Sequence, residues 1–274
     1  MSGLDSKGNL IGQGNTAEIF EWGSDKIIKL YRHGLPDDLC VHEFEITKYA
    51  YETLKIAPNP IEIVRVDGRI GAIYERLSGK TMLKLMLSKP WRISKYSKML
   101  AQCHVSMQKS ADMRTETVKE KLRRDIESIS LINLQEKQLI FKYLEDLPDG
   151  NIICHFDFHP DNIMISADKY YVIDWMTACA GNPLSDIART ALILNYAEIP
   201  RVPAFVNRLI GIFQKSIYRR YLREYIRLTG VDFSDIQKWE LPVAAARLCE
   251  WIPDGESKRL VAFVKKELKN ITTL

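Results

Sequence analysis

The sequence lacks long apolar runs and grouped cysteines, and each absence removes a class of protein. No stretch approaches the roughly 20 apolar residues of a membrane-spanning helix, and the start, MSGLDSKGNLIGQG, has no basic-then-apolar signal pattern. The five cysteines form no CxxC pair and are odd in number. This pattern argues against a disulfide framework or a metal cluster, and it predicts reduced thiols in a cytoplasmic protein with no membrane partner.

The sequence also lacks an excess of charge of one sign. Its 39 basic residues are interspersed with 35 acidic ones, which argues against a nucleic-acid partner. With 274 residues the chain is long enough for about two domains and a sizeable core. The composition therefore predicts an ordinary globular protein, and any function must come from particular residues.

The order of predicted elements indicates an α+β fold with two lobes. Residues 8–31 read as three strands, a helix starts near Pro36, and residues 61–77 read as a hairpin through Asp67-Gly68. We therefore predict a small, mostly antiparallel β lobe over residues 1–77 and a larger, mostly helical lobe over 78–274, joined by a hinge at 77–79. Helical patterns cover about 81–88, 91–109, 115–130, 134–145, 184–197, 201–228, 234–249 and 255–271.

The richest chemistry lies in ICHFDFHPDNIMIS and the following YYVIDW, residues 153–166 and 170–175. Asp157 has the chemistry to take the proton of an attacking hydroxyl, and Asn162 and Asp174 offer the hard oxygen ligands that Mg²⁺ prefers. The strand YYVI is expected to pair with NIMIS and so to bring Asp174 beside Asn162. The competing interpretation is a polar turn in which these residues only cap the backbone. We expect His155 to hold the loop, and His159 either to do the same or to contact substrate.

A glycine-containing turn and a lysine predict the nucleotide side. Residues Gly12 to Ala17 join two strands, and their amides suit phosphates. No Gly-Lys-Ser/Thr follows, so this is not a Walker loop. Lys29, on the next strand, points either to solvent or to phosphate. A buried lysine needs an acidic partner, and we favour Glu43 over Glu45 on the helix that follows, the alternative for each being a solvated charge.

Together these residues resemble the aminoglycoside phosphotransferase and choline kinase family, which has a two-lobed protein-kinase-like fold. IGQGNTAEIF resembles its phosphate loop, KIIKLY its lysine strand, AIYERLSG its lobe-connecting strand, CHFDFHPDN its HGDLHPGN loop and VIDW its metal-binding strand. The resemblance implies ATP, or GTP, with Mg²⁺, and phosphate transfer to a small hydroxylated acceptor. It implies the roles that follow: Asp157 as base; Asn162 and Asp174 on Mg²⁺; Lys29, Glu43, Gly12, Gly14, Asn15, Thr16, Glu75 and Leu77 on the nucleotide; Asp186 supporting the catalytic loop; His104 buried in a helix.

The acceptor stays open at this point. Phe156 replaces the second residue of the family's HGDLHPGN loop, a glycine. Basic residues of the long helix at 201–228 suit an anionic acceptor, and acidic residues near the end suit a cationic one with Trp239 and Trp251, but solvated faces explain both sets. A protein kinase is a second enzyme reading, although DFG and APE segments are missing. A nucleotide-binding module without catalysis is the third. The acidic residues near the end of the chain that suit a cationic acceptor are Glu240, Glu250, Asp254 and Glu256.

Overall fold

The computed structural model describes residues 7–111, 115–166, 169–199 and 202–272. The chain forms two compact units, one of Met1–Leu87 with Pro160–Ala178 and one of Ser88–His159 with Cys179–Leu274. These units differ from the predicted lobes, because residues 78–87 and 160–178 pack with the N-terminal part. The predicted α+β class is confirmed by an antiparallel five-stranded sheet and a helical part.

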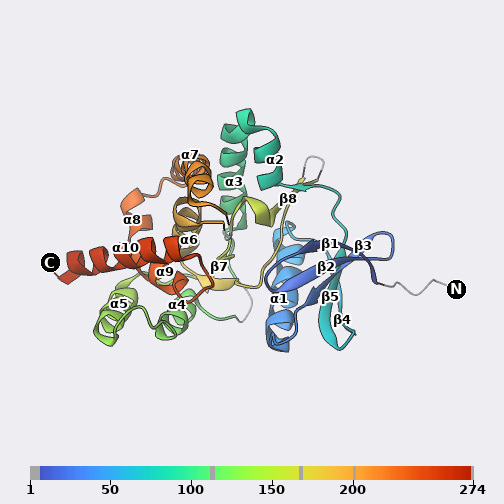
Figure 1. Ribbon diagram of the computed structural model, residues 1–274, viewed down its shortest axis with the longest axis horizontal. Coiled ribbons are helices and arrows are strands. Elements are labelled where there is room, and N and C mark those ends of the chain that lie inside the picture. Colours follow the sequence, from blue (N-terminus) through green and yellow to red (C-terminus); the bar gives the residue numbers. More distant parts are fainter. Residues whose placement is uncertain (1–6, 112–114, 167–168, 200–201, 273–274) are drawn as a thin grey trace. The chain divides into compact units, whose positions relative to one another are not determined.

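The five-stranded sheet of the first unit has the order β1-β2-β3-β5-β4, and every pairing is antiparallel (Figure 1). The predicted hairpin is confirmed, since Asp67 and Gly68 both have positive φ, 52° and 74°, as a tight two-residue turn requires. The strands are β1 Lys7–Gln13, β2 Ala17–Trp22, β3 Lys26–Tyr31, β4 Pro60–Val66 and β5 Arg69–Glu75.

Alternation along β3 sorts its side chains between the two faces of the sheet. Tyr31 belongs to the core cluster that includes Cys40 and Phe44 of helix α1 (Asp37–Tyr49), whereas Ile28 and Leu30 belong to a cluster on the other face. Lys29 therefore shares the helix-facing side with Tyr31. The helix continues as a π-helical turn, η1 (Ala50–Leu54).

A second sheet in the first unit carries the segment predicted to return Asp174 beside Asn162. Strand β8 (Ile163–Ser166) pairs with β9 (Lys169–Val172) and with the short β6 (Lys80–Thr81), and a 3₁₀ turn, η3 (Pro160–Asn162), precedes it. Ile173 N–H donates to the Asn162 carbonyl at 2.9 Å. The predicted pairing of these strands is confirmed.

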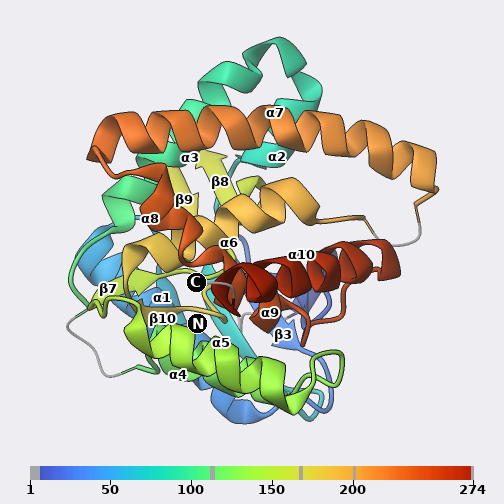
Figure 2. The same cartoon turned by 90° about the vertical axis from the view of Figure 1, so that its left-hand side faces the viewer.

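The second unit is mainly helical, with one two-stranded ladder between β7 (Ile152–Cys154) and β10 (Cys179–Gly181). Its long helix α7 lies alongside α3 and α6 (Figure 2). No helix of the described ranges is both long and apolar enough to cross a membrane. The helices of the second unit are η2 Pro90–Arg92, α3 Ile93–Met107, α4 Val118–Glu127, α5 Leu134–Asp146, α6 Pro183–Tyr196, α7 Ala204–Thr229, α8 Phe233–Gln237, α9 Glu240–Arg247 and α10 Asp254–Thr272, and helix α2 (Met82–Ser88) belongs to the first unit up to Leu87.

The prediction of a single helix over residues 234–249 is wrong. The structure has two helices there, α8 and α9, with a break at Lys238 and Trp239. Pro242 explains the break, because proline has no N–H to give to the carbonyl four residues earlier. Restarting the helix at Glu240 places Pro242 in a first turn, where an amide hydrogen is not needed.

Gly79 allows a close backbone approach that a larger residue prevents. A Cβ there would lie 2.3 Å from the Ile165 carbonyl oxygen in β8, the central strand of its sheet. We expect Gly79→Ala to lower the free energy of unfolding by about 2 kcal/mol, measured by urea denaturation. Gly211→Ala is the matched control, because it adds a methyl group to open space in α7 and should stabilise by about 0.5–1 kcal/mol. Equal stability of Gly79→Ala and the unmodified protein would contradict the steric argument.

Candidate active site

The ion pair expected between Lys29 and Glu43 is present in the first unit. Lys29 Nζ lies 2.6 Å from Glu43 Oε1 and 2.8 Å from Asp174 Oδ1. Glu43 is buried and also accepts a hydrogen bond from the Tyr31 hydroxyl at 2.8 Å, whereas Glu45 is exposed. Residues 29, 43 and 174, far apart in the sequence, thus converge on one ammonium group that does not point to solvent.

The charge on Lys29 is stabilised although the side chain is only 12% exposed. Burial by itself lowers the pKa of this ammonium, but the carboxylates of Glu43 and Asp174 outweigh burial and hold the pKa above its ordinary value. The two carboxylates differ in access, with side-chain exposures of 3% for Glu43 and 43% for Asp174. The site therefore has a permanent cation with one buried anchor and one accessible partner.

Asn162 and Asp174 stand at adjacent ends of the β8–β9 hairpin. Asp174 has a φ of 65°, in the left-handed region that residues other than glycine rarely adopt. Asn162 is nearly buried, at 7% exposure. The described residues contain no group of three or more His, Cys, Asp or Glu side chains able to hold a metal alone. One carboxylate and one amide oxygen nevertheless fit Mg²⁺, which commonly takes one or two protein oxygens and completes its shell with phosphates and water.

The turn between β1 and β2 is exposed and held by its own backbone. Gly14 N–H donates to the Ala17 carbonyl at 2.8 Å, and the Arg32 guanidinium donates twice to the Gly14 carbonyl, at 3.1 and 3.2 Å. Neither Gly12 nor Gly14 is among the described glycines with positive φ, so the conformation does not require them. The roles of Gly12, Gly14, Asn15 and Thr16 at the phosphates stay predictions. The side chain of Glu75 lines a different cavity, of about 610 Å³, with Tyr51 and Lys55, and the backbone role of Glu75 and Leu77 stays a prediction.

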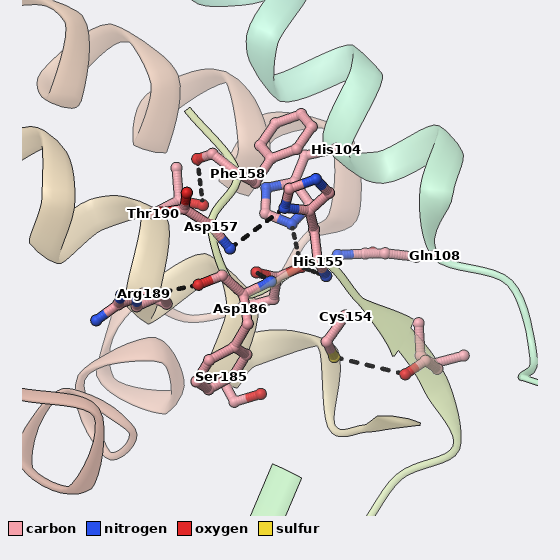
Figure 3. A network of polar contacts seen from close by, with 12 residues as sticks. His104, Gln108, Cys154, His155, Asp157, Phe158, Ser185, Asp186, Arg189 and Thr190 are labelled. Atoms are coloured by element: carbon pink, nitrogen blue, oxygen red, sulfur yellow. Dashed lines mark hydrogen bonds and ion pairs between the residues drawn. The ribbon is translucent and has the colours of Figure 1, made fainter. Parts of the chain in front are cut away.

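In the second unit, the carboxylate of Asp186 organises the loop that carries Asp157 (Figure 3). It accepts hydrogen bonds from the backbone N–H groups of His155, at 2.7 Å, and Phe156, at 2.9 Å. His104 Nε2 lies 3.1 Å from the same carboxylate, and its Nδ1 lies 2.7 Å from the Tyr221 hydroxyl. A proton on Nε2 of His104 satisfies both contacts, since the Tyr221 hydroxyl then donates to Nδ1.

Phe156 has a strained backbone conformation that several contacts hold in place. Its φ is 63°, a conformation that costs about 1–2 kcal/mol for a residue with a Cβ. The ring is buried, which is worth more than that cost, and both backbone groups are tied down. Its N–H donates to Asp186, and its carbonyl accepts from Arg189 Nε at 3.1 Å. A glycine, which the resembling family has here, would adopt this φ without strain.

Asp157 is held as a charged carboxylate. Its N–H donates to His155 Nδ1 at 3.2 Å, which is the loop-holding role expected of His155. His159 Nε2 lies 3.4 Å from Asp157 Oδ2. Burial by itself raises the pKa of Asp157, but the His159 hydrogen bond and the charges of His159 and Arg189 outweigh it and hold the pKa below its ordinary range. The group is therefore ionised at neutral pH and able to accept hydrogen bonds.

Arg189 is the functional residue that sequence reasoning missed. It is buried and pairs with Glu250 at 2.5 Å, and Glu250 pairs in turn with Arg247. The signal was its position three residues after Asp186, which places both on one face of a helix. The network also bears on the acidic residues near the end of the chain. Glu250 and Glu256 form ion pairs with arginines. Trp239 is buried, and Trp251 is fully exposed.

Comparison with known families identifies the family of the chain. The model of the phosphotransferase enzyme family matches residues 8–225. The chain therefore belongs to the phosphotransferase enzyme family, and the predicted family resemblance is confirmed. None of the curated proteins matches the chain.

Solved structures share the fold at low sequence identity. The chain is similar to an aminoglycoside-3'-phosphotransferase of type VIII, with 14% identity over 89% of this chain and 94% of that one, and a TM-score of 0.62. It is similar to the choline kinase LicA from Streptococcus pneumoniae, with 17% identity over 97% and 94% and a TM-score of 0.63. A streptomycin-ATP complex of the aminoglycoside phosphotransferase APH(2")-IIa has 15% identity over 96% and 92% and a TM-score of 0.58.

The burial of Asp186 predicts a defined pH dependence of stability. Burial by itself raises its pKa, but His104 and His155 outweigh burial and hold the pKa below the ordinary 3.8. A depressed pKa means that the stabilisation is complete above about 3.8 and is lost as the pH falls through the lower, folded-state pKa. We expect Asp186→Asn to lower the free energy of unfolding by about 3 kcal/mol at neutral pH, a gap that narrows only below about pH 4.

Urea unfolding of both proteins from neutral to acid pH measures this gap. The exposed Asp232→Asn should show almost none at any pH. A gap that already closes between about pH 7 and 5 would contradict the assignment, because it would place the folded-state pKa of Asp186 too high.

Proposed function

We propose that this protein is an ATP-dependent kinase that transfers the γ-phosphate to a hydroxyl group of a small molecule. The observation that carries the proposal is the ionised Asp157 carboxylate, fixed by a loop whose backbone is tied to Asp186 and Arg189. Membership in the phosphotransferase enzyme family supports it. GTP offers the same phosphates and is the alternative donor.

The first unit would hold the nucleotide. Lys29 would bind phosphate oxygens while Glu43, its buried partner, keeps the ammonium in place. The accessible Asp174 would exchange this contact for the cation that accompanies the nucleotide. Backbone groups of Gly12, Gly14, Asn15 and Thr16 would lie over the phosphates, and those of Glu75 and Leu77 would meet the base.

Asn162 and Asp174 would hold Mg²⁺, as their hard oxygens and adjacent positions suggest. When bound, this ion neutralises charge on the phosphates. Asp157 would accept a hydrogen bond from the acceptor hydroxyl and orient it. As the oxygen–phosphorus bond forms, the bond from the γ-phosphorus to the bridging oxygen breaks. The hydroxyl proton passes to Asp157, and a nucleoside diphosphate leaves.

An aminoglycoside-like or choline-like acceptor is the substrate class we propose. The similar structures named above include an aminoglycoside phosphotransferase bound to streptomycin and a choline kinase. A protein kinase or a silent nucleotide-binding module uses the same nucleotide residues. These alternatives are separated by what accepts the phosphate.

An acceptor screen tests the proposal directly. ADP release from Mg·ATP is measured with aminoglycosides, choline, thiamine, sugars and amino alcohols, and product is identified by mass. We expect one class to give product and ADP in equal amounts, and Asp157→Asn to lose at least about 100-fold in turnover because the hydroxyl loses its proton acceptor. Nucleotide affinity should stay within about twofold, since Asp157 is not assigned to the nucleotide.

The exposed Asp149→Asn is the control and should retain full turnover. Three results would each refute the proposal. These are phosphorylation of a generic protein with no small-molecule product, ATP binding without transfer to any acceptor, and undiminished transfer by Asp157→Asn.

A further inference from the structure

A second cavity lies wholly within the helical unit. It has a volume of about 280 Å³ and is lined by residues of α6, α7, α8, α9 and α10, helices of the part shown in Figure 2. Aromatic side chains contribute much of its wall, and a single carboxylate lines it. Its lining residues include Asn195, Tyr196, Tyr218, Phe233, Glu240 and Phe263.

Glu240 is unusual in this molecule because its carboxylate has no counter-charge. Among the described residues it has neither a hydrogen-bond donor nor an ion-pair partner, although Glu250 and Glu256 on nearby segments are both paired with arginines. Burial raises its pKa to about 7, and the negative charge of Glu267 adds to the effect. A half-buried carboxylate in this state is stabilised by any cation that enters.

The cavity is separate from the loop that carries Asp157. On α6, Asp186 and Thr190 bond the loop, whereas Asn195 lies on the opposite face and lines the cavity. Glu240 begins α9, and Glu250, the partner of Arg189, lies beyond the other end of that helix. No residue of the catalytic-loop network lines this cavity.

We propose that this cavity is a binding site for a small organic cation, with the positive group beside Glu240 and the apolar part among the rings of Tyr196, Tyr218 and Phe263. Aromatic faces attract cations, and a desolvated cation gains more from them than an exposed one. The volume lies at the lower end for ligand sites, which suits a primary or quaternary amine no larger than a single ring with a short chain and excludes a whole aminoglycoside. The site requires no phosphate transfer, so it goes beyond the proposed function.

The experiment titrates phenethylammonium into the nucleotide-free protein by calorimetry, at about pH 8 so that Glu240 is ionised. The other groups facing Glu240 are Glu267, Tyr196 and Tyr218, with Arg259 acting on Tyr196. Phenethyl alcohol is the neutral probe of similar shape. We expect saturable binding of the cation at about millimolar concentration and at least about tenfold weaker binding of the alcohol.

Variants then locate the site. Glu240→Gln should weaken cation binding at least about tenfold, and Phe263→Leu should weaken it about threefold. Glu127→Gln, an exposed glutamate elsewhere, should not weaken it. Asp157→Asn should bind the cation normally, which separates this site from an acceptor site at the catalytic loop. Absence of saturable binding, undiminished binding by Glu240→Gln, or loss of binding in Asp157→Asn would overturn the proposal, whatever the result of the acceptor screen.

Discussion

The catalytic loop depends on one buried carboxylate, that of Asp186. A charge that is 2% exposed must have its hydrogen bonds satisfied, and this one is satisfied by the amides of His155 and Phe156 and by His104. The two adjacent amides can both reach it only if the chain turns sharply at Phe156. The strained φ of that residue is therefore a consequence of the contact, and the turn sets the direction in which Asp157 leaves the backbone.

The first unit applies the same principle with the opposite sign. Lys29 is the buried cation, and Glu43 and Asp174 come to it from distant parts of the sequence. In both units a buried charge acts as a cross-link between segments that are far apart in the sequence, and removing that charge leaves its buried partners unpaired. Glu240, unlike Glu43, Glu250 and Glu256, has no cationic partner among the described residues, and for that reason its cavity suggests a missing cation rather than a structural contact.

Sequence patterns predicted the turns and strand pairings that depend on residues close together in the sequence. The Asp67-Gly68 turn fixed a hairpin, and the pairing of residues 163–166 with 169–172 followed from two apolar runs, whereas the sequence left Lys29 facing either solvent or phosphate. The helix restart before Pro242 was open to the same local reasoning, because proline suits a first turn. Two features depended on contacts between distant residues: the left-handed Phe156 is held by Asp186 and Arg189, and the burial of Arg189 depends on its pairing with Glu250. The functional roles of the site residues remain predictions that biochemistry must test.

The most direct test of the account is nucleotide affinity at Lys29. We expect Lys29→Met to weaken Mg·ATP binding at least about tenfold by calorimetry, whereas Lys48→Met on the exposed side of α1 should leave it unchanged. The double variant Lys29→Met/Glu43→Gln, which leaves no unpaired charge at Glu43, should show the same loss in a folded protein. Full affinity in both Lys29 variants would mean that this buried ammonium serves only the fold, and it would contradict the claim that the first unit is built around a triphosphate.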